Sequence, residues 1–110
     1  MSFGHIFAAM KFDKANYVKK DILSSGKLHV GLLCFEPGQG QKSHAHEQND
    51  KVYFIHEGVA TTTVGKETKE LGPGACALAK AGEAHEIWNK GRDRLTVVVF
   101  TSPPVGEHAK

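Results

Sequence analysis

The spacing of turn-forming residues constrains this chain more than any other feature of its sequence. Glycine and proline recur roughly every eight to twelve residues, and β-branched, aliphatic and aromatic residues fill the intervals. This pattern leaves little room for helices and is typical of a sandwich or barrel built from short strands. We therefore predict an all-β fold. The expected strands are residues 17–23, 28–35, 51–56, 60–64, 67–70, 75–79, 85–88 and 95–101.

The length of the chain sets the number of domains. Its 110 residues are enough for one hydrophobic core but not for two independent cores. No linker, internal repeat or low-complexity segment divides the sequence, so we expect a single domain over residues 1–110. The first ten residues fit either a short helix or an extra strand, and the last nine, SPPVGEHAK, are expected to be a loose end.

The charge distribution argues against two classes of partner. The net charge is +2 and the lysines are scattered, so neither nucleic acid nor an anionic membrane surface is expected as a partner. No apolar run approaches the roughly 18 residues that cross a bilayer, and the N-terminus lacks the features of a secretory signal. Cys34 and Cys76 lie in apolar runs, which predicts two reduced, buried thiols in a cytoplasmic protein.

Three histidines stand near the expected ends of strands. His44 and His46 come just before an apolar run, and in an extended chain residues two apart project to the same side. Two adjacent imidazoles can bind a divalent transition metal such as Fe, Mn, Ni, Cu or Zn. His85 follows the turn at Gly82 and opens a later strand. It would complete a set of three if the two segments face each other in a barrel.

The residues around these histidines resemble the two conserved motifs of the cupin superfamily. The first motif covers about residues 38–58 and the second about residues 74–89, and the 15 residues between them match the short spacing of small bacterial cupins. The resemblance implies a small jelly-roll β-barrel with a metal held in its mouth. The residues that carry it are Gly38, His44, His46, Gly58, Gly74, Gly82, His85 and Asn89.

One position departs from the cupin pattern. The family usually holds its metal with three histidines and one glutamate, and Lys51 occupies the glutamate position here. A protonated ammonium cannot ligate a cation and is repelled by it. Three arrangements remain open. Asp50 could supply the missing carboxylate through a local bulge; Lys51 could face the cavity beside a metal held by the three histidines; or Lys51 could lean to the rim beside an empty or weak site.

Two classes of function follow from this resemblance. The first is a metalloenzyme that acts on a small organic molecule, by dioxygenase-, isomerase- or decarboxylase-type chemistry, with Lys51 or Tyr53 handling a proton. The second is a non-catalytic module that binds or senses a small molecule or a metal. Both classes need a small-molecule or metal ligand. The apolar runs VGLLCF and LTVVVF, which have no polar face, predict in addition a homodimer.

Overall fold

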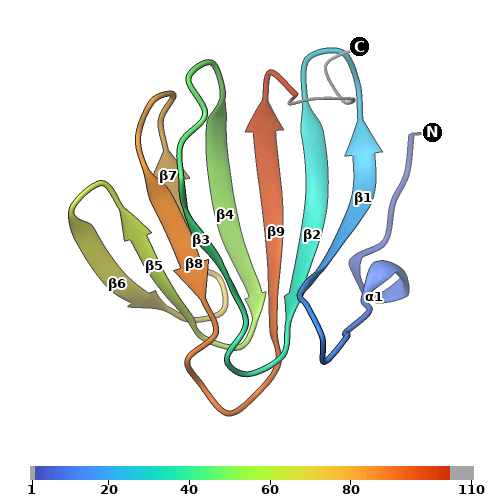
Figure 1. Cartoon of the computed structure of the whole chain (residues 1–110). Coiled ribbons are helices and arrows are strands. Elements are labelled where there is room, and N and C mark those ends of the chain that lie inside the picture. Colours follow the sequence, from blue (N-terminus) through green and yellow to red (C-terminus); the bar gives the residue numbers. More distant parts are fainter. Residues whose placement is uncertain (1, 105–110) are drawn as a thin grey trace.

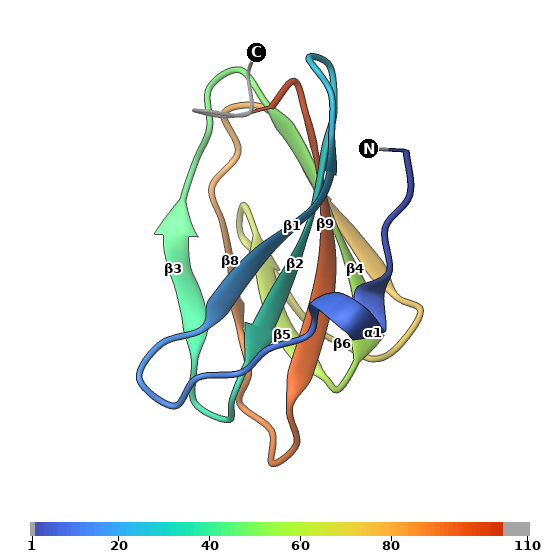
Figure 2. The ribbon, with the colours of Figure 1, turned by 90° about the vertical axis from the view of Figure 1, so that its right-hand side faces the viewer.

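The protein folds into two antiparallel sheets over residues 2–104, the part of the chain that the computed structural model describes (Figure 1). The elements are α1 (Ile6–Ala9), β1 (Val18–Ser24), β2 (His29–Phe35), β3 (Gly40–His44), β4 (Asp50–Glu57), β5 (Ala60–Val64), β6 (Glu67–Leu71), β7 (Cys76–Ala79), β8 (His85–Trp88) and β9 (Leu95–Ser102). One sheet has the strand order β1-β2-β9-β4-β7 and the other β3-β8-β5-β6. Figure 2 shows the two layers from the side, with β3 and β8 in one layer and β1, β2 and β9 in the other.

The predicted all-β fold is confirmed, and eight of the described strands match the predicted ranges to within one residue. The remaining strand, β3, is absent from the predicted set because its sequence GQKSH is polar and has no alternating apolar residues. It forms at the edge of the four-stranded sheet, where its main chain pairs with β8. Pairing by the main chain leaves no apolar pattern in the sequence, so periodicity cannot predict such a strand.

The N-terminal segment contains a short helix. The choice between a helix and an extra strand is settled in favour of the helix, because residues 6–9 form α1. No helix in the described part of the chain has the length and apolar character that a membrane span requires. At the other end, the loose segment predicted for SPPVGEHAK falls mostly on residues 105–110, which lie outside the described residues.

The hydrophobic core lies between the two sheets. Alternate residues of each strand face inward, so that Tyr53 and Ile55 of β4 and Ile87 of β8 are fully buried. The core continues across β2, β5 and β9. Its buried members are Leu33, Phe35, Tyr53, Ile55, Ala60, Ile87, Leu95, Val97 and Val99.

A second apolar cluster covers the outer face of the five-stranded sheet. Residues of α1 and the segment after it pack on Leu32, Cys34 and Val98, and Figure 2 shows α1 on this outer side. Cys34 is therefore buried as predicted, but under the N-terminal segment and not in the barrel. The prediction for Cys76 was wrong, because this cysteine is exposed. It stands on the edge strand β7, where Ala79 is buried on the inner face and Cys76 faces out.

The apolar strands β2 and β9 are covered on both faces within the chain. Val97 and Val98 are both buried, one between the sheets and one under the N-terminal segment. This coverage accounts for most of the apolar surface from which the homodimer was predicted. The outer face still exposes Phe54 by 37%, Leu78 by 50% and Phe100 by 37%. The homodimer stays a prediction.

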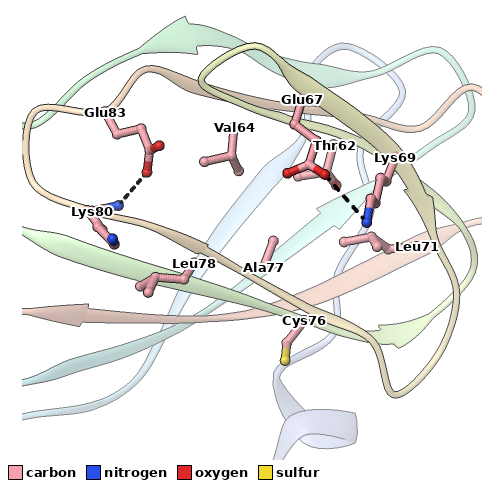
Figure 3. Close-up of a pocket in the computed structure, with 10 residues that line it drawn as sticks. All are labelled: Thr62, Val64, Glu67, Lys69, Leu71, Cys76, Ala77, Leu78, Lys80 and Glu83. Carbon is pink, nitrogen blue, oxygen red and sulfur yellow. Dashed lines mark hydrogen bonds and ion pairs between the residues drawn. The ribbon is translucent and has the colours of Figure 1, made fainter.

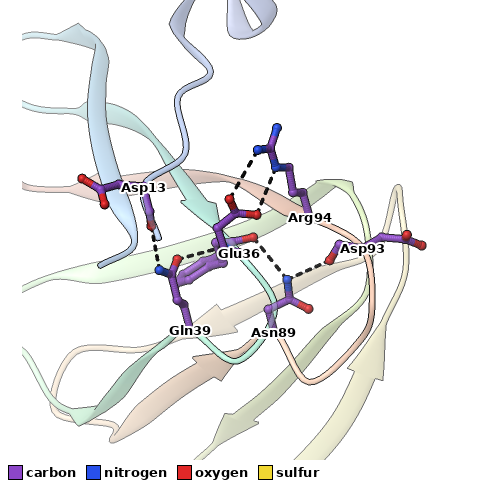
Figure 4. Close-up of polar contacts among 7 residues, drawn as sticks. Asp13, Glu36, Gln39, Asn89, Asp93 and Arg94 are labelled. Atoms are coloured by element: carbon purple, nitrogen blue, oxygen red, sulfur yellow. Dashed lines mark hydrogen bonds and ion pairs between the residues drawn. The ribbon is translucent and has the colours of Figure 1, made fainter. Parts of the chain in front are cut away.

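Asn89 closes the end of the sandwich away from the histidines. Its side chain is buried, and its Nδ2 donates to the carbonyls of Phe35 at 3.2 Å and Asp93 at 2.9 Å (Figure 4). Its main chain also bonds the turn before β3, because Gly38 N donates to Asn89 O at 2.7 Å. The last residue of the second motif therefore has a structural role, since it joins the loops that flank β3, β8 and β9.

The last glycine of the first motif should be intolerant of a side chain. Gly58 has φ +88°, and a Cβ added there would lie 2.4 Å from the main-chain oxygen of Arg94. We expect Gly58→Ala to lower the free energy of unfolding by about 2 kcal/mol or more, because backbone strain and steric overlap add. Urea-induced unfolding would measure the change.

Gly72→Ala is the matched control for this prediction. Gly72 also lies in a turn between strands, but it has no positive φ and no atom lies within 4 Å of an added Cβ. Its substitution should change the free energy of unfolding by no more than about 0.5 kcal/mol. Equal losses for the two variants would contradict the account of Gly58.

Candidate metal centre

The pairing of β3 with β8 brings the two histidine motifs together. His44 and His85 are direct cross-strand partners, and their ring centroids are 4.3 Å apart. Beyond the end of β3, Gly82 N donates to the carbonyl oxygen of His46 at 2.8 Å. This bond holds the loop after β3 against the turn before β8. The two histidine motifs lie some forty residues apart in the sequence. They are joined by strand pairing and, past the end of β3, by the bond between the flanking loops.

A bulge in β3 turns His44 toward the interior. Gln41 pairs with Ile87 and His44 pairs with His85, so three steps on β3 match two steps on β8. With regular alternation, Gln41 and His44 would face opposite sides of the sheet. The extra residue changes the phase, as bulges do, and both side chains face inward. His46 lies just after the strand, and its ring centroid is 5.1 Å from that of His44.

Main-chain carbonyls fix the tautomers of two of the imidazoles. His44 Nδ1 lies 2.8 Å from the oxygen of Lys42, and His85 Nδ1 lies 2.9 Å from the oxygen of Glu83. A carbonyl oxygen only accepts hydrogen bonds, so Nδ1 carries the proton and Nε2 keeps its lone pair in both rings. Metal-binding histidines are commonly oriented in this way.

The Nε2 atom of His85 is buried and has no hydrogen-bond partner among the described residues. An unsatisfied buried acceptor costs about 1–3 kcal/mol, so its presence calls for a ligand. One ligand atom from each of His44, His46 and His85 lies within 4.8 Å of the others. Two nitrogens each about 2.1 Å from one ion are at most about 4.2 Å apart. A small inward shift of the rings would therefore let all three bind one metal.

The environment of His46 and His85 favours the neutral imidazole, which is the form that binds metals. Burial lowers the pKa of His85, and the charges of His44 and Lys51 lower it further. The hydrogen bond to the Glu83 carbonyl acts in the opposite direction and raises this pKa. Burial also lowers the pKa of His46, with Lys51 as the next cause. All three histidines fit a divalent transition metal by donor type. His44 and His85 also fit by tautomer, and the lowered pKa of His46 and His85 favours their neutral form.

A cavity of about 500 Å³ opens beside the histidines, between the edge strands β1 and β3. Lysines are prominent in its wall, and none of the described residues that line it is acidic. The lining residues are Tyr17, Lys19, Gly40, Gln41, Lys42, His44, His46 and Lys51.

Lys51 lies on the inner face of the sandwich. It alternates with the buried Tyr53 on β4, and its cross-strand partners Ala79 and Thr101 are buried. Burial lowers the pKa of Lys51 to about 8, and the charge of Lys19 contributes. This position agrees with the arrangement in which Lys51 faces the cavity beside the histidines.

Asp50 and Tyr53 lie outside the cluster of three histidines. Asp50 is exposed and outside the three-histidine group, and its Oδ1 accepts a hydrogen bond from Ala81 N at 2.8 Å. Tyr53 is fully buried, its hydroxyl donates to Gln41 Oε1 at 3.3 Å, and burial raises its pKa. The Tyr53 hydroxyl therefore stays protonated at neutral pH. The roles of Asp50 as a ligand and of Tyr53 and Lys51 in proton transfer stay predictions.

Lys19 lines the cavity and was not predicted to do so. It precedes the bulge in β1 and pairs with Leu33, which belongs to the inner core, whereas its neighbour Lys20 pairs with Leu32 on the outer face. Alternation along β1 could have shown that the two lysines point to opposite faces. It could not have shown that β1 is an edge strand next to β3.

A second cavity, of about 330 Å³, lies at the opposite edge of the sandwich, between β6 and β7 (Figure 3). Three of its charged side chains have partners close by. Lys69 Nζ is 3.5 Å from Glu67 Oε2, and Glu83 Oε1 accepts from the main chain of Lys80 at 3.1 Å. This cavity has mixed charge, unlike the one beside the histidines.

Comparison with known proteins agrees with this architecture. The sequence pattern of the cupin domain matches residues 31–101. An uncharacterized protein of Streptomyces coelicolor is 35% identical over 81 residues, which are 74% of this chain and 76% of that protein. A crystal structure of a Thermus thermophilus protein superposes with a TM-score of 0.89 and 32% identity, over 94% of this chain and 98% of that one. KdgF from a Halomonas species has a TM-score of 0.85 at 19% identity, over 97% of both chains, and shares the fold.

The two facing sheets and the three converging histidines define a small β-barrel with a possible metal site in its mouth. The family match covers more than half of the chain, and the chain belongs to the cupin family. The resemblance of the two histidine motifs to cupins is thereby confirmed.

The buried position of Lys51 should make the stability of the metal-free protein depend on pH. Its pKa is lowered from 10.5 to about 8, so above pH 8 the folded protein releases this proton before the unfolded chain does. The free energy of unfolding should therefore rise between about pH 8 and 10.5, toward a limit of about 3 kcal/mol that residual solvent contact reduces. Urea unfolding at several pH values measures this rise.

Lys51→Met should remove the rise and stabilise the metal-free protein at pH 7. Lys66 lies in the exposed turn between β5 and β6, so Lys66→Met is the matched control and should follow the wild-type profile. Parallel pH profiles for wild type and Lys51→Met would show that Lys51 is not buried in this way.

Proposed function

We propose that this cupin is a metal-dependent enzyme that acts on a small organic molecule in the cavity beside His44, His46 and His85. The observation that carries the proposal is the buried, unpartnered Nε2 of His85, which lies with ligand atoms of the other two histidines in one cluster within the described part of the chain. A barrel that served only as a scaffold would have no need for this costly arrangement.

The imidazoles and Lys51 would have separate tasks in this site. The three imidazoles would hold a divalent transition metal, and their Nδ1 bonds to main-chain carbonyls keep two of the rings in place. When bound, such a metal supplies Lewis-acid activation of a substrate oxygen, or dioxygen chemistry if it is iron or copper. Lys51 stands close enough to the cavity to exchange a proton with a substrate, and its pKa of about 8 suits that task.

Tyr53 would position the other groups. Its hydroxyl donates to Gln41, whose Nε2 donates to the hydroxyl of Tyr17 at 3.1 Å. This chain of hydrogen bonds orients Gln41 and Tyr17 in the cavity wall. Tyr53 also lies beside the histidine cluster, with its ring centroid 6.0 Å from that of His85.

A non-catalytic binding module is the second candidate. The observation that favours it is Lys51, a cation at the position where the family usually has a carboxylate ligand. Screening small molecules by thermal shift, followed by analysis of products, separates the two functions. An enzyme converts a molecule that it binds, whereas a binding module shifts the melting temperature and yields no product.

Metal content provides the first test of the site. Protein purified without chelator should contain about one divalent transition metal per chain, and His44→Ala or His85→Ala should reduce this to a trace. The cause is the loss of one of three ligands. His56, which bonds Thr96 Oγ1 at 3.0 Å and lies outside the cluster, gives the control variant His56→Ala. Equal trace amounts in wild type and all three variants would refute the metal site.

Two further variants address the fourth ligand position. Because Asp50 already accepts a bond from Ala81, Asp50→Asn should change the metal dissociation constant by less than about threefold. Lys51→Met should tighten metal binding several-fold, since it removes a nearby positive charge. Competition with a chromophoric chelator measures both constants. A large loss for Asp50→Asn would instead identify Asp50 as a ligand.

A further inference from the structure

The charge of the cavity restricts the molecule that it can accept. Lys19, Lys42 and Lys51 line it together with His44 and His46, and none of the described residues in its wall carries a negative charge. A divalent metal would add two more positive charges at the same place. Positive charges gathered in a cavity with low-dielectric walls attract anions and concentrate them.

Three carboxylates on neighbouring segments lie outside the cavity wall and bond to other groups. Asp50 accepts from Ala81 N at 2.8 Å, and Glu83 accepts from Lys80 N at 3.1 Å. Asp21 lies 2.9 Å from His29 Nε2. The charged group that acts most on Lys51 is another cation, Lys19, and not an acid.

The two lysines come from different strands and meet at the same opening. Lys51 lies on the inner face of β4, and Lys19 lies on the inner face of β1 before its bulge. The cavity between β1 and β3 lies between these strands and the histidines of β3. A molecule in the cavity would therefore have the imidazoles on one side and the two ammonium groups on another.

The uncharged groups of the wall also favour a ligand that accepts hydrogen bonds. Tyr17 OH receives a hydrogen bond from Gln41 Nε2 at 3.1 Å, and its own proton has no acceptor among the described residues. It can therefore donate to a ligand oxygen. The wall thus offers three ammonium groups and one hydroxyl proton, which are all donors.

We propose that the cavity binds a small organic anion through a carboxylate or phosphate group, with Lys19 and Lys51 as its charged anchors. This inference rests on the proposed function, because it names the class of molecule that would reach the metal. The volume of about 500 Å³ suits a small molecule and not a polymer segment. The cavity between β6 and β7 differs, because both acidic and basic side chains line it and Lys69 pairs with Glu67 there.

Isothermal titration calorimetry with matched probes tests the inference. Succinate is compared with the neutral succinamide, and glycerol 3-phosphate with glycerol, on protein with and without added Zn²⁺. We expect the anion of at least one pair to bind at least about tenfold more tightly than its neutral counterpart, and the pair that responds identifies the group. The preference should weaken as salt is raised.

Three variants assign the effect to the cavity. Lys51→Met and Lys19→Met should each weaken binding of the responding anion by about tenfold, through loss of a charge-assisted bond. Lys20 is adjacent to Lys19 on β1 but pairs with Leu32 on the outer face, so Lys20→Met should change the affinity by less than about twofold. This control separates a local contact from the net charge of the protein.

The possible outcomes are distinct. Equal affinity for the charged and neutral probe of both pairs, or an anion preference that survives both cavity substitutions, would overturn the inference. Metal content measured on the same samples tests the proposed function separately. Protein that binds no metal but prefers the anion in a lysine-dependent way supports the anion site while contradicting the metalloenzyme. Protein that binds metal but shows no preference for the anion supports the metalloenzyme while contradicting the anion site.

Discussion

The site depends on the pairing of β3 with β8. Main-chain contacts join these segments from Gly38 and Asn89 at one end to His46 and Gly82 at the other. The bulge within the pairing turns His44 inward, opposite His85. Without this register, the first motif would present different side chains to the second. The polar bonds of Asn89 fix the far end of the same pair of strands.

The second constraint is electrostatic. Lys51 and the histidines share an interior position, where burial and the charge of Lys51 lower the pKa of His46 and His85. Within residues 2–104, the buried Lys51 has no carboxylate partner and Nε2 of His85 has no hydrogen-bond partner, and both of these features oppose folding. Proteins tolerate such local costs chiefly at functional sites. A metal bound by the imidazoles and an anion bound by the lysines would relieve both costs, which links the two proposals physically.

Much of this architecture could be predicted from the sequence, because alternation and turn residues are local signals. The strand ranges belong to this part, whereas the meeting of His44 with His85 was implied by the resemblance of the two motifs to cupins. Other features depend on which strands form the edges of the sheets. The polar strand β3, the exposure of Cys76 on β7 and the inward direction of Lys19 are of this kind. Only the three-dimensional order of the strands determines these features, so periodicity along one segment could not predict them.

The central claim is that three imidazoles hold one metal in the mouth of the barrel. Anomalous diffraction from crystals of protein loaded with Zn²⁺ tests this claim most directly. The account predicts a single anomalous peak about 2.1 Å from Nε2 of both His44 and His85 and from one ring nitrogen of His46, with Nδ1 of the first two rings still bonded to main-chain carbonyls. A peak elsewhere on the protein, or none among the three rings at full occupancy of added metal, would contradict it.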